Sequence, residues 1–453
     1  MRRLALGVLV AGAVVGCAGA SAGAGGEGGG AAHTGPAPAE DAPGVAQAAS
    51  IYRRIGRLAS AEPLPFVGTV AFAGGTGDTA LAIVALSLAN RSLTFEREPN
   101  GYTARYRVDI SLAAERGAPL TVAREEVVRV STLQETTRTD ESVLFQQSFK
   151  VLPGRQHVIV SLRDMASGVE GRAEADYQAP AFAAGTTSEP ILAYQAKGRG
   201  ERSEPLQLVV NPRGTIGLNG DTLLVYVEGY SLSGAQAVPF EVRSQTDSVI
   251  YRDSLRFRGG RPVESQVLRV TPDSLSLGEV RLVVGSGAAE RRVSALVSVT
   301  PGSVVTDYDQ MLAYLRYWGP NPYLDSLRKA PPADRARLWR AFVRSTDQNP
   351  KTPQNEQLDE YFARVATANA QIRDEGIPGW RTDRGEVFIV LGPPDEASEA
   401  GQMSSRLIRW YYPNYRLTLY FADESGFGRY RLIQQSRADF DRLVARLRRG
   451  RGG

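Results

Sequence analysis

The segment at residues 379–396 reads GWRTDRGEVFIVLGPPDE and is the most distinctive stretch of the chain. Trp380, Thr382 and Asp383 stand close together within it. Thr and Asp side chains can bond to nearby backbone amides and fix a turn, and a Trp buries most of its ring when it lies in a core. We therefore predict that the segment begins with a turn that anchors the C-terminal part of the fold.

The second half of this segment is apolar and ends abruptly. Gly385 would permit a positive φ angle ahead of the apolar run at residues 386–391. That run is short and rich in β-branched residues, so we predict a buried strand. Pro393 and Pro394 then end the strand and stiffen the exit.

Helical patterns precede this segment and strand patterns follow it. Apolar residues spaced i, i+3, i+4 and i+7 begin at Tyr308, and further helices follow the prolines at 331–332 and at 353. A last helix is expected to begin near Ser436. The predicted strands lie at residues 386–391, 407–411, 417–421 and 429–433. Residues 303–450 are therefore predicted to form an α+β domain.

Residues 307–434 resemble the GWxTD domain, which defines a family of bacterial envelope-associated proteins without an established biochemical role. The resemblance rests on separated blocks in matching order: GWRTDRG at 379–385, LGPPDE at 391–396, WYY at 410–412 and FADESGFGRY at 421–430. It implies β-sandwich-like regions ahead of the domain, and it carries over no catalytic residue.

A first β-rich region has clear strand signals. Apolar and polar residues alternate over 102–112, which is the pattern of a strand with one buried face. Asn100-Gly101 is a hairpin signal that pairs this strand with residues 92–98. Residues 81–88 are almost entirely apolar, as in a strand that is covered on both faces.

A second β-rich region follows, with Asn219-Gly220 as another hairpin signal. Its predicted strands lie at residues 222–227, 263–270, 279–284 and 292–299. Repeated short strands separated by turns favour β-sandwiches. We predict β-sandwich-like domains at 51–185 and 200–302, so the fold class is mostly β with a C-terminal α+β domain.

Residues 1–17 have the features of a bacterial lipoprotein signal. Arg2 and Arg3 precede an apolar stretch shorter than the ~20 residues that span a bilayer. The stretch ends in VVGC at residues 14–17, which resembles a lipobox, and Cys17 is the only cysteine in the chain. We predict cleavage before Cys17 and lipidation of its thiol. The alternative is an ordinary secretory signal in which Cys17 is incidental.

Residues 18–50 are mostly Gly and Ala with scattered Pro. Such a segment cannot bury enough surface to offset its ordering entropy, so it is predicted to be a flexible tether. Ala18, rather than Asp, follows Cys17, which favours the outer membrane over the inner one. We expect an exported, lipid-anchored protein that is otherwise periplasmic or on the cell surface.

The composition argues against disulfides, and the predicted export argues against a nucleic-acid partner. The 453 residues carry a formal net charge of +4, and a single cysteine forms no intramolecular disulfide. Basic residues gather near the C-terminus, where they complement a helix dipole: Arg442, Arg446, Arg448, Arg449 and Arg451. We expect an envelope protein or polymer as partner, and no nucleic acid.

Few residues suit catalysis or metal binding. His33 and His157 are the two histidines of the chain, so a His-based zinc site or a Ser-His-Asp triad is close to excluded. Acidic pairs that could share a calcium ion lack the EF-hand pattern: Asp307 with Asp309, and Asp423 with Glu424. We expect no cofactor, no metal site and no catalytic residue.

The candidate binding residues are those of the distinctive segment: Gly379, Trp380, Thr382, Asp383, Arg384, Gly385, Pro393, Pro394 and Asp395. They suit either the construction of a turn, a strand and a stop, or the lining of a groove. The main hypothesis is a non-catalytic binding or assembly module in the envelope. Two alternatives are a hydrolase of an envelope polymer that uses Asp383, Asp395 and Asp423, and a purely structural assembly component. A buried Trp380 would favour a scaffold, and an exposed one a site.

Overall fold

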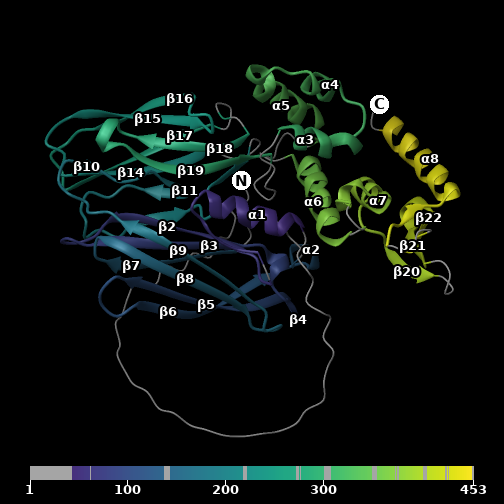
Figure 1. The fold of residues 1–453 in the computed structure, drawn as a ribbon, viewed down its shortest axis with the longest axis horizontal. Coiled ribbons are helices and arrows are strands. Elements are labelled where there is room, and N and C mark those ends of the chain that lie inside the picture. Colours follow the sequence, from purple (N-terminus) through teal and green to yellow (C-terminus); the bar gives the residue numbers. More distant parts are fainter. Residues whose placement is uncertain are drawn as a thin grey trace, which may run out of the picture. The chain divides into compact units, whose positions relative to one another are not determined.

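The computed structural model describes residues 43–61, 63–136, 143–217, 222–271, 275, 277–299, 308–348, 355–372, 374, 377–400, 406–423, 426 and 428–450. Figure 1 colours the elements in chain order. Some predicted features lie outside the described residues: the signal with Cys17, the tether as far as residue 42, the Asn219-Gly220 turn, Asp307 and Glu424.

The first β region consists of two antiparallel sheets that share one core. One sheet has the order β1(Leu58–Ser60), β2(Phe66–Gly74), β3(Ala80–Leu88), β7(Val143–Val151). The other has the order β4(Glu96–Glu98), β5(Gly101–Ala114), β8(Gly154–Asp164), β9(Glu170–Ala179), with β6(Leu120–Val130) paired to β5. Short helices lie in the connections: η1(Asn90–Ser92) and α2(Leu133–Thr136). Val84 and Leu86 of β3 share a hydrophobic cluster with Val108 of β5 and Val160 of β8. The sheets therefore pack face to face, as in a β-sandwich.

Strand β5 confirms the alternation predicted for residues 102–112. Its side chains at every second position from Ala104 to Leu112 are buried. Strand β4 pairs with it antiparallel, and Glu98 lies opposite Gly101. The predicted hairpin is therefore present, although its first strand is shorter than expected.

Strand β3 is buried on both faces, as its apolar sequence predicts. Val84 and Leu86 face the core of the first β region. Ile83 and Ala85 instead join a second cluster with Tyr226 and other residues of the second β region. Because each face of β3 has an apolar neighbour, its sequence shows no polar alternation.

The second β region also has two sheets around a common core. One has the order β10(Thr186–Thr187), β14(Leu223–Tyr230), β11(Ile191–Lys197), β12(Gln207–Val210), with β17(Val263–Val270) paired to β14. The other has the order β13(Thr215–Gly217), β19(Arg291–Ser298), β18(Gly278–Val284), β15(Gln236–Ser244), β16(Val249–Phe257). The 3₁₀ helix η3(Gly287–Ala289) precedes β19. Val225, Phe240 and Leu282 lie in the shared core. The strands predicted in this region are confirmed within one to three residues at their ends.

A buried ion pair ties the two β regions together. Arg199 donates through Nε to Glu228 Oε1 at 2.7 Å, and through Nη2 to Glu228 Oε2 at 2.9 Å and to the Gly74 carbonyl of β2 at 2.6 Å. The hydroxyls of Tyr226 and Tyr230 each donate to Glu228 at 2.6 Å. The side chains of Arg199 and Glu228 are 2% and 0% exposed. Burial, and then the charge of Glu228, raise the pKa of Tyr230 well above its ordinary value, so its hydroxyl remains a donor.

One correction concerns the end of the predicted tether. Residues 43–50 belong to helix α1(Pro43–Arg54) rather than to an extended linker. Proline suits the first turn of a helix, and the alanines that follow are strong helix formers. Tyr52 and Ile55 of this helix are buried in a cluster with Val67 and Leu296. The apolar residues beyond position 50 therefore give the helix a surface on which to fold.

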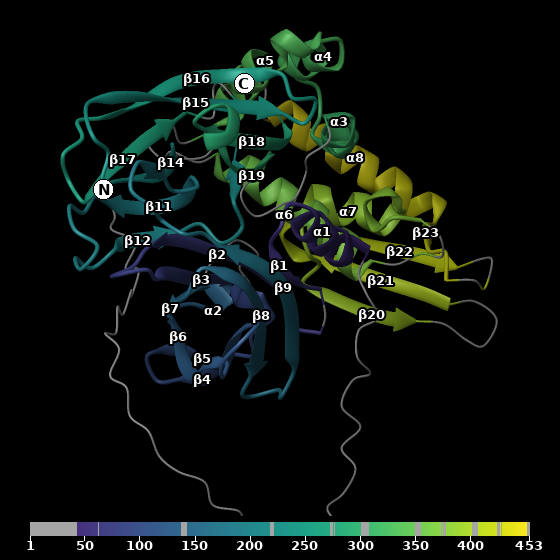
Figure 2. The same cartoon turned by 60° about the vertical axis from the view of Figure 1, so that its left-hand side comes forward.

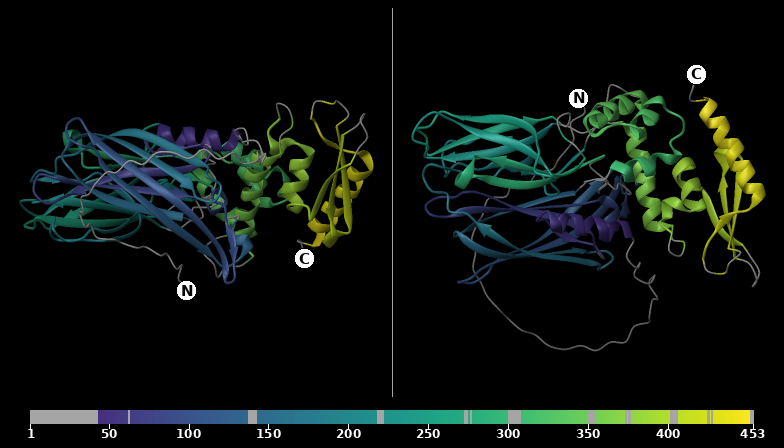
Figure 3. Two further views of the ribbon diagram at one scale, coloured as in Figure 1. Left: turned by 90° about the horizontal axis from the view of Figure 1, so that it is seen from below. Right: turned by 45° about the horizontal axis from the view of Figure 1, so that its top comes forward.

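The C-terminal region is α+β, as predicted. Its helices are α3(Tyr308–Tyr314), η4(Leu315–Tyr317), α4(Pro322–Arg328), α5(Pro332–Thr346), α6(Glu356–Gln371), η5(Gly379–Arg381), α7(Asp383–Leu391), η6(Pro413–Tyr415) and α8(Gln434–Gly450). Its antiparallel sheet has the order β20(Glu396–Ala400), β21(Arg406–Tyr412), β22(Leu417–Asp423), β23(Arg431–Leu432). Helix α8 runs beside β22 (Figures 2 and 3). Among the described residues, the helices are all too short or too polar to cross a membrane.

The strand predicted at residues 386–391 is wrong, because the chain forms helix α7 there. Thr382 is the N-cap of this helix and accepts a hydrogen bond from the Gly385 amide. Asp383 and Glu386 lie in the first turn, where acidic side chains complement the helix dipole. The run VFIVL is apolar on every face, so its pattern does not distinguish a buried helix from a buried strand.

Replacing Arg199 with Met should strongly destabilise the β regions, because the buried Glu228 side chain would lose its ion-pair partner. Removal of one partner from a buried ion pair costs about 3–5 kcal/mol. Urea unfolding followed by circular dichroism measures the loss. The control is Arg172→Gln, which breaks a pair with Glu174 whose side chains are 59% and 53% exposed. We expect that control to change the free energy of unfolding by less than about 0.5 kcal/mol. Equal effects of the two substitutions would contradict the assigned role of the buried pair.

Candidate functional site

The distinctive segment folds as a 3₁₀ turn followed by helix α7. The Thr382 hydroxyl donates to the Gly379 carbonyl at 2.8 Å and accepts from the Gly385 amide at 2.9 Å. The Thr382 amide also donates to the Gly379 carbonyl at 3.1 Å. Thr382 is only 4% exposed. One buried side chain therefore closes η5 and caps α7 at the same time.

Gly379 and Gly385 are required for close packing rather than for unusual backbone angles. A Cβ atom on Gly379 would clash with the carbonyl oxygens of Ala368 and Ile372 at the end of α6. A Cβ atom on Gly385 would clash with the Gly379 carbonyl. Gly385 does not have a positive φ, so that part of the sequence prediction is wrong. Its real constraint is the contact between the first turn of α7 and η5.

Trp380 is buried in the domain core, at 6% exposure. Its ring meets Tyr314 edge to face at 5.1 Å, and the Arg381 guanidinium lies 4.9 Å from the ring centre. Its backbone amide donates to Asn369 Oδ1 at 3.1 Å, and its carbonyl accepts from the Tyr317 hydroxyl at 3.1 Å. This burial favours a scaffold role for Trp380 over direct contact with a ligand.

Asp383 and Arg384 hold the turn to neighbouring elements. Asp383 Oδ2 accepts from the Leu432 amide of β23 at 2.8 Å, and its other oxygen lies 3.2 Å from Arg437 of α8. Arg384 pairs with Asp374 at 2.7 Å and lies over the ring of Tyr430 at 4.6 Å. Asp383 therefore fastens α7 to β23 and α8, whereas Arg384 links α7 to Asp374 ahead of the motif and to Tyr430 just before β23.

Pro393, Pro394 and Asp395 lie in the exit from α7 and not beside the turn. Gly392 ends the helix with a φ of 89°, and its carbonyl accepts from the Tyr412 hydroxyl at 3.1 Å. The Asp395 amide donates to the Tyr411 carbonyl at 3.1 Å, which starts the pairing of β20 with β21. The Asp395 side chain itself is exposed.

The three carboxylates considered for hydrolysis lie in separate places and do not form one cluster. Asp383 joins α7 to β23 and α8, and Asp395 is exposed in the loop before β20. Asp423 accepts from the amides of Gly426 and Gly428 at 3.0 and 2.7 Å, which shapes the turn after β22. Among the described residues, no group of three or more His, Cys, Asp or Glu side chains is arranged to hold a metal ion.

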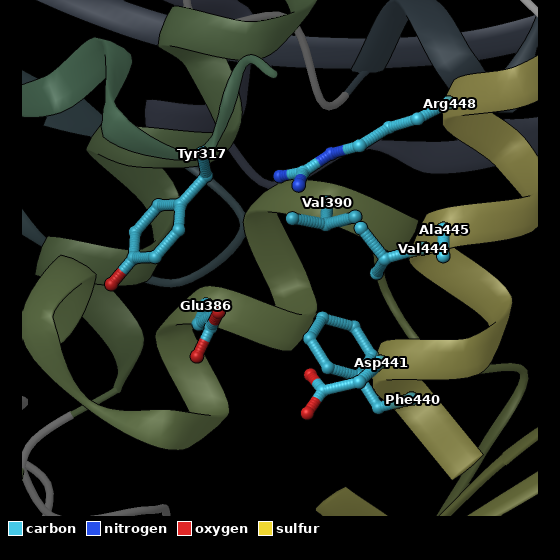
Figure 4. Close-up of a pocket in the computed structure, with 8 residues that line it drawn as sticks. All are labelled: Tyr317, Glu386, Val390, Phe440, Asp441, Val444, Ala445 and Arg448. Atoms are coloured by element: carbon cyan, nitrogen blue, oxygen red, sulfur yellow. The ribbon is translucent and has the colours of Figure 1, made fainter. Parts of the chain in front are cut away.

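A pocket of about 230 Å³ lies beside the segment, between η4, α7 and α8 (Figure 4). Its lining residues are Tyr317, Glu386, Val390, Phe440, Asp441, Val444, Ala445 and Arg448. Glu386 and Val390 come from α7, so the Thr382 cap positions one wall of the pocket. Tyr317 forms another wall, and its hydroxyl is bonded to the Trp380 carbonyl.

Arg437 organises the acidic side of this pocket. Its guanidinium lies 2.8 Å from Glu386, 3.2 Å from Asp383 and 3.9 Å from Asp441. Burial opposes the charge of Arg437, but the hydrogen bonds to Glu386 and Asp383 and the carboxylate charges outweigh it and raise its pKa. Burial raises the pKa of Tyr317; the charge of Arg316 opposes this rise, and the charges of Glu386 and Asp383 add to it.

Sequence reasoning missed this pocket. It predicted a last helix from near Ser436, but it assigned residues 386–391 to a strand, so it could not place Glu386 and Val390 on a helix facing α8. The sequence did contain one signal for the α8 wall of the pocket. Arg437, Asp441 and Ala445 are spaced four residues apart, which places them on one face of a helix.

Comparisons with known proteins agree with the resemblance in the sequence. The model of the GWxTD domain family matches residues 285–439. No curated protein matches the chain. Among solved structures, trypsin-activated alpha-2-macroglobulin from Escherichia coli is 13% identical, with a TM-score of 0.16, and the match covers 53% of this chain and 18% of that one. The native conformation of the E. coli protein gives 11% identity, a TM-score of 0.17, and coverage of 51% and 16%. This chain therefore spans less than a fifth of either protein's length, and TM-scores this low do not establish a shared fold.

Gly385→Ala should destabilise the C-terminal domain, because the new methyl group would overlap the Gly379 carbonyl. Overpacking of this kind costs about 1–3 kcal/mol. Tryptophan fluorescence during urea unfolding reports on this domain, because it contains all four tryptophans, at positions 318, 339, 380 and 410. Gly234→Ala is the matched control, since a Cβ atom there meets nothing within 4 Å. Circular dichroism should show that this control is close to neutral. An unchanged transition in Gly385→Ala would refute the packing argument.

Proposed function

Because this chain is a GWxTD domain-containing protein, we propose that it is a membrane-anchored, non-catalytic binding or assembly module of the bacterial cell envelope. In this proposal Cys17 carries the lipid and the Gly-rich segment after it is a tether. The β regions act as spacers or binding modules, and the C-terminal domain holds the recognition site. The partner is an envelope protein or polymer rather than nucleic acid.

The observation that best supports this proposal is that the motif residues make contacts that stabilise the domain itself. Thr382 bonds to backbone groups on both sides, and Trp380 is buried. The nearby pocket offers a tyrosine whose hydroxyl donates to a backbone carbonyl, and a glutamate held by Arg437. Neither group stands beside an activated nucleophile of the kind that covalent catalysis needs. Such a pocket is suited to binding.

The alternative of a carboxylate-dependent hydrolase has little support in this geometry. Glycoside hydrolysis needs two carboxyl groups that flank one bond. Asp383, Asp395 and Asp423 each bind a different part of the backbone or face solvent, and none of them lines the pocket. We therefore retain binding or assembly as the proposed role.

Cys17→Ser should abolish membrane anchoring if the lipobox is used. Two or more acyl chains hold a protein stably at a membrane. The Cys17→Ser variant has no thiol to carry them, so it lacks this anchor. Metabolic labelling with an alkyne-tagged palmitate, followed by detergent phase partition, measures the effect. The wild-type protein should be labelled and enter the detergent phase, and Ser21→Ala should behave like the wild type. Equal labelling of Cys17→Ser and wild type would refute this anchor.

A substitution that fills the pocket should abolish binding of the partner without unfolding the domain. Ala445 lines the pocket and is exposed on α8, so Ala445→Trp places a bulky ring in the cavity. Ala438→Trp is the matched control, because Ala438 is exposed on the same helix but outside the pocket lining. Affinity purification from detergent-solubilised envelopes, quantified by mass spectrometry, compares the two variants.

A partner retained by Ala438→Trp and reduced at least tenfold by Ala445→Trp would support the proposal. If both variants retained the same partners as the wild type, binding would have to occur elsewhere. The full-length protein is used throughout, and circular dichroism checks that each variant is folded.

A further inference from the structure

The pocket between α7 and α8 has groups of opposite charge at its two ends. Figure 4 shows the carboxylates of Glu386 and Asp441 on one side and the Arg448 guanidinium on the other, with Val390 and Val444 between them. The pocket is therefore polarised along its length, with an apolar middle.

The acidic end carries excess negative charge. The carboxylates of Asp383, Glu386 and Asp441 all lie within 4 Å of Arg437, at 3.2, 2.8 and 3.9 Å. Arg437 alone cannot neutralise three carboxylates, and the other nearby guanidinium, that of Arg316, lies over the Tyr317 ring at 5.0 Å from its centre. The Asp441 side chain is 62% exposed, so it is the carboxylate most open to an incoming cation.

The basic end is formed by Arg448, which lies in the last turn of α8. Within the described part of the chain, Arg448 makes no ion pair with a carboxylate. Its stem passes close to Gly319, where a Cβ atom would lie 3.5 Å from Arg448 Nε. The side chain thus reaches toward the pocket with its charge available to an anion.

The size of the pocket limits the ligand. Its volume of about 230 Å³ falls below the ~300–1,000 Å³ typical of sites for drug-sized molecules. Val390, Val444 and Phe440 offer apolar contact for a short aliphatic chain. One group about as large as an amino acid fits these dimensions better than a nucleotide or a sugar chain.

We propose that this pocket binds an ω-amino carboxylate. Its ammonium would lie at Glu386 and Asp441, its carboxylate at Arg448, and its aliphatic stem on Val390 and Val444. This inference rests on the proposed binding function and names the class of ligand. The same chemistry is present in a free diamino acid and in a diamino acid at the C-terminus of a peptide.

A matched set of probes tests both charges. Ligand-observed NMR titrations of the purified full-length protein compare 6-aminohexanoate and 4-aminobutanoate with hexylamine and hexanoate. We expect at least one of the doubly charged probes to bind about three- to fivefold more tightly than either singly charged one, because it gains a second ion pair worth up to ~1 kcal/mol. Equal binding of all four probes, or none by the doubly charged ones, would overturn the proposal.

Two exposed substitutions then locate the charges. Asp441→Asn and Arg448→Gln should each weaken the doubly charged probe about three- to fivefold. Of the two singly charged probes, Asp441→Asn should weaken the binding of hexylamine and not of hexanoate, and Arg448→Gln should weaken the binding of hexanoate and not of hexylamine. Arg446→Gln is the control, because Arg446 is exposed on α8 outside the pocket lining. Equal losses in all three variants would show a general charge effect and refute the site.

The source of the ligand is resolved by two further probes, free lysine and acetyl-Ala-Ala-Lys. Tighter binding of the peptide would assign the pocket to a peptide end, and tighter binding of lysine would assign it to a free amino acid. These titrations do not depend on Cys17. If the probes bind but the protein is not anchored to the membrane, only the lipid anchor is refuted. If the protein is anchored but the probes do not bind, only this ligand class is refuted.

Discussion

The contact between η5 and the first turn of α7 is the constraint on which the C-terminal domain depends. The Thr382 hydroxyl bridges the Gly379 carbonyl and the Gly385 amide, and the two glycines leave room for that approach. A larger residue at Gly379 would push η5 away from the end of α6, and a larger residue at Gly385 would push α7 away from η5. Since α7 supplies Val387, Ile389 and Leu391 to the core, this small turn sets the position of a whole layer of side chains.

Two side chains connect this turn to the neighbouring helices and so fix their positions relative to it. Tyr317 of η4 donates to the Trp380 carbonyl, and Arg437 of α8 pairs with Asp383 and Glu386. Tyr317 also forms a wall of the pocket, and Arg437 holds its acidic end. The geometry of the pocket is therefore coupled to the motif through packing and ion pairs, although none of the motif residues at 379–385 lines it.

Much of the β architecture could be predicted from sequence, because burial leaves a local pattern in strands. The alternation in β5 and the continuous apolar run of β3 both reflect the number of faces that are covered. Helix α7 could not be predicted in this way, since a run that is apolar on all sides has no period. The better signal was the N-cap Thr382 with acidic residues after it. The pocket required both α7 and α8 in their packed positions, and that information is not local.

In the proposed function, fold and recognition are assigned to different residues of this domain. The motif side chains are mostly buried, so almost any change to them costs stability before it alters binding. Asp441, Ala445 and Arg448 are exposed on one face of α8, where substitutions usually cost less than about 0.5 kcal/mol. The charge and shape of the pocket can therefore change along α8 while the GWxTD turn stays constant. A domain built in this way can keep one scaffold and accept different ligands, which is the behaviour expected of a binding module.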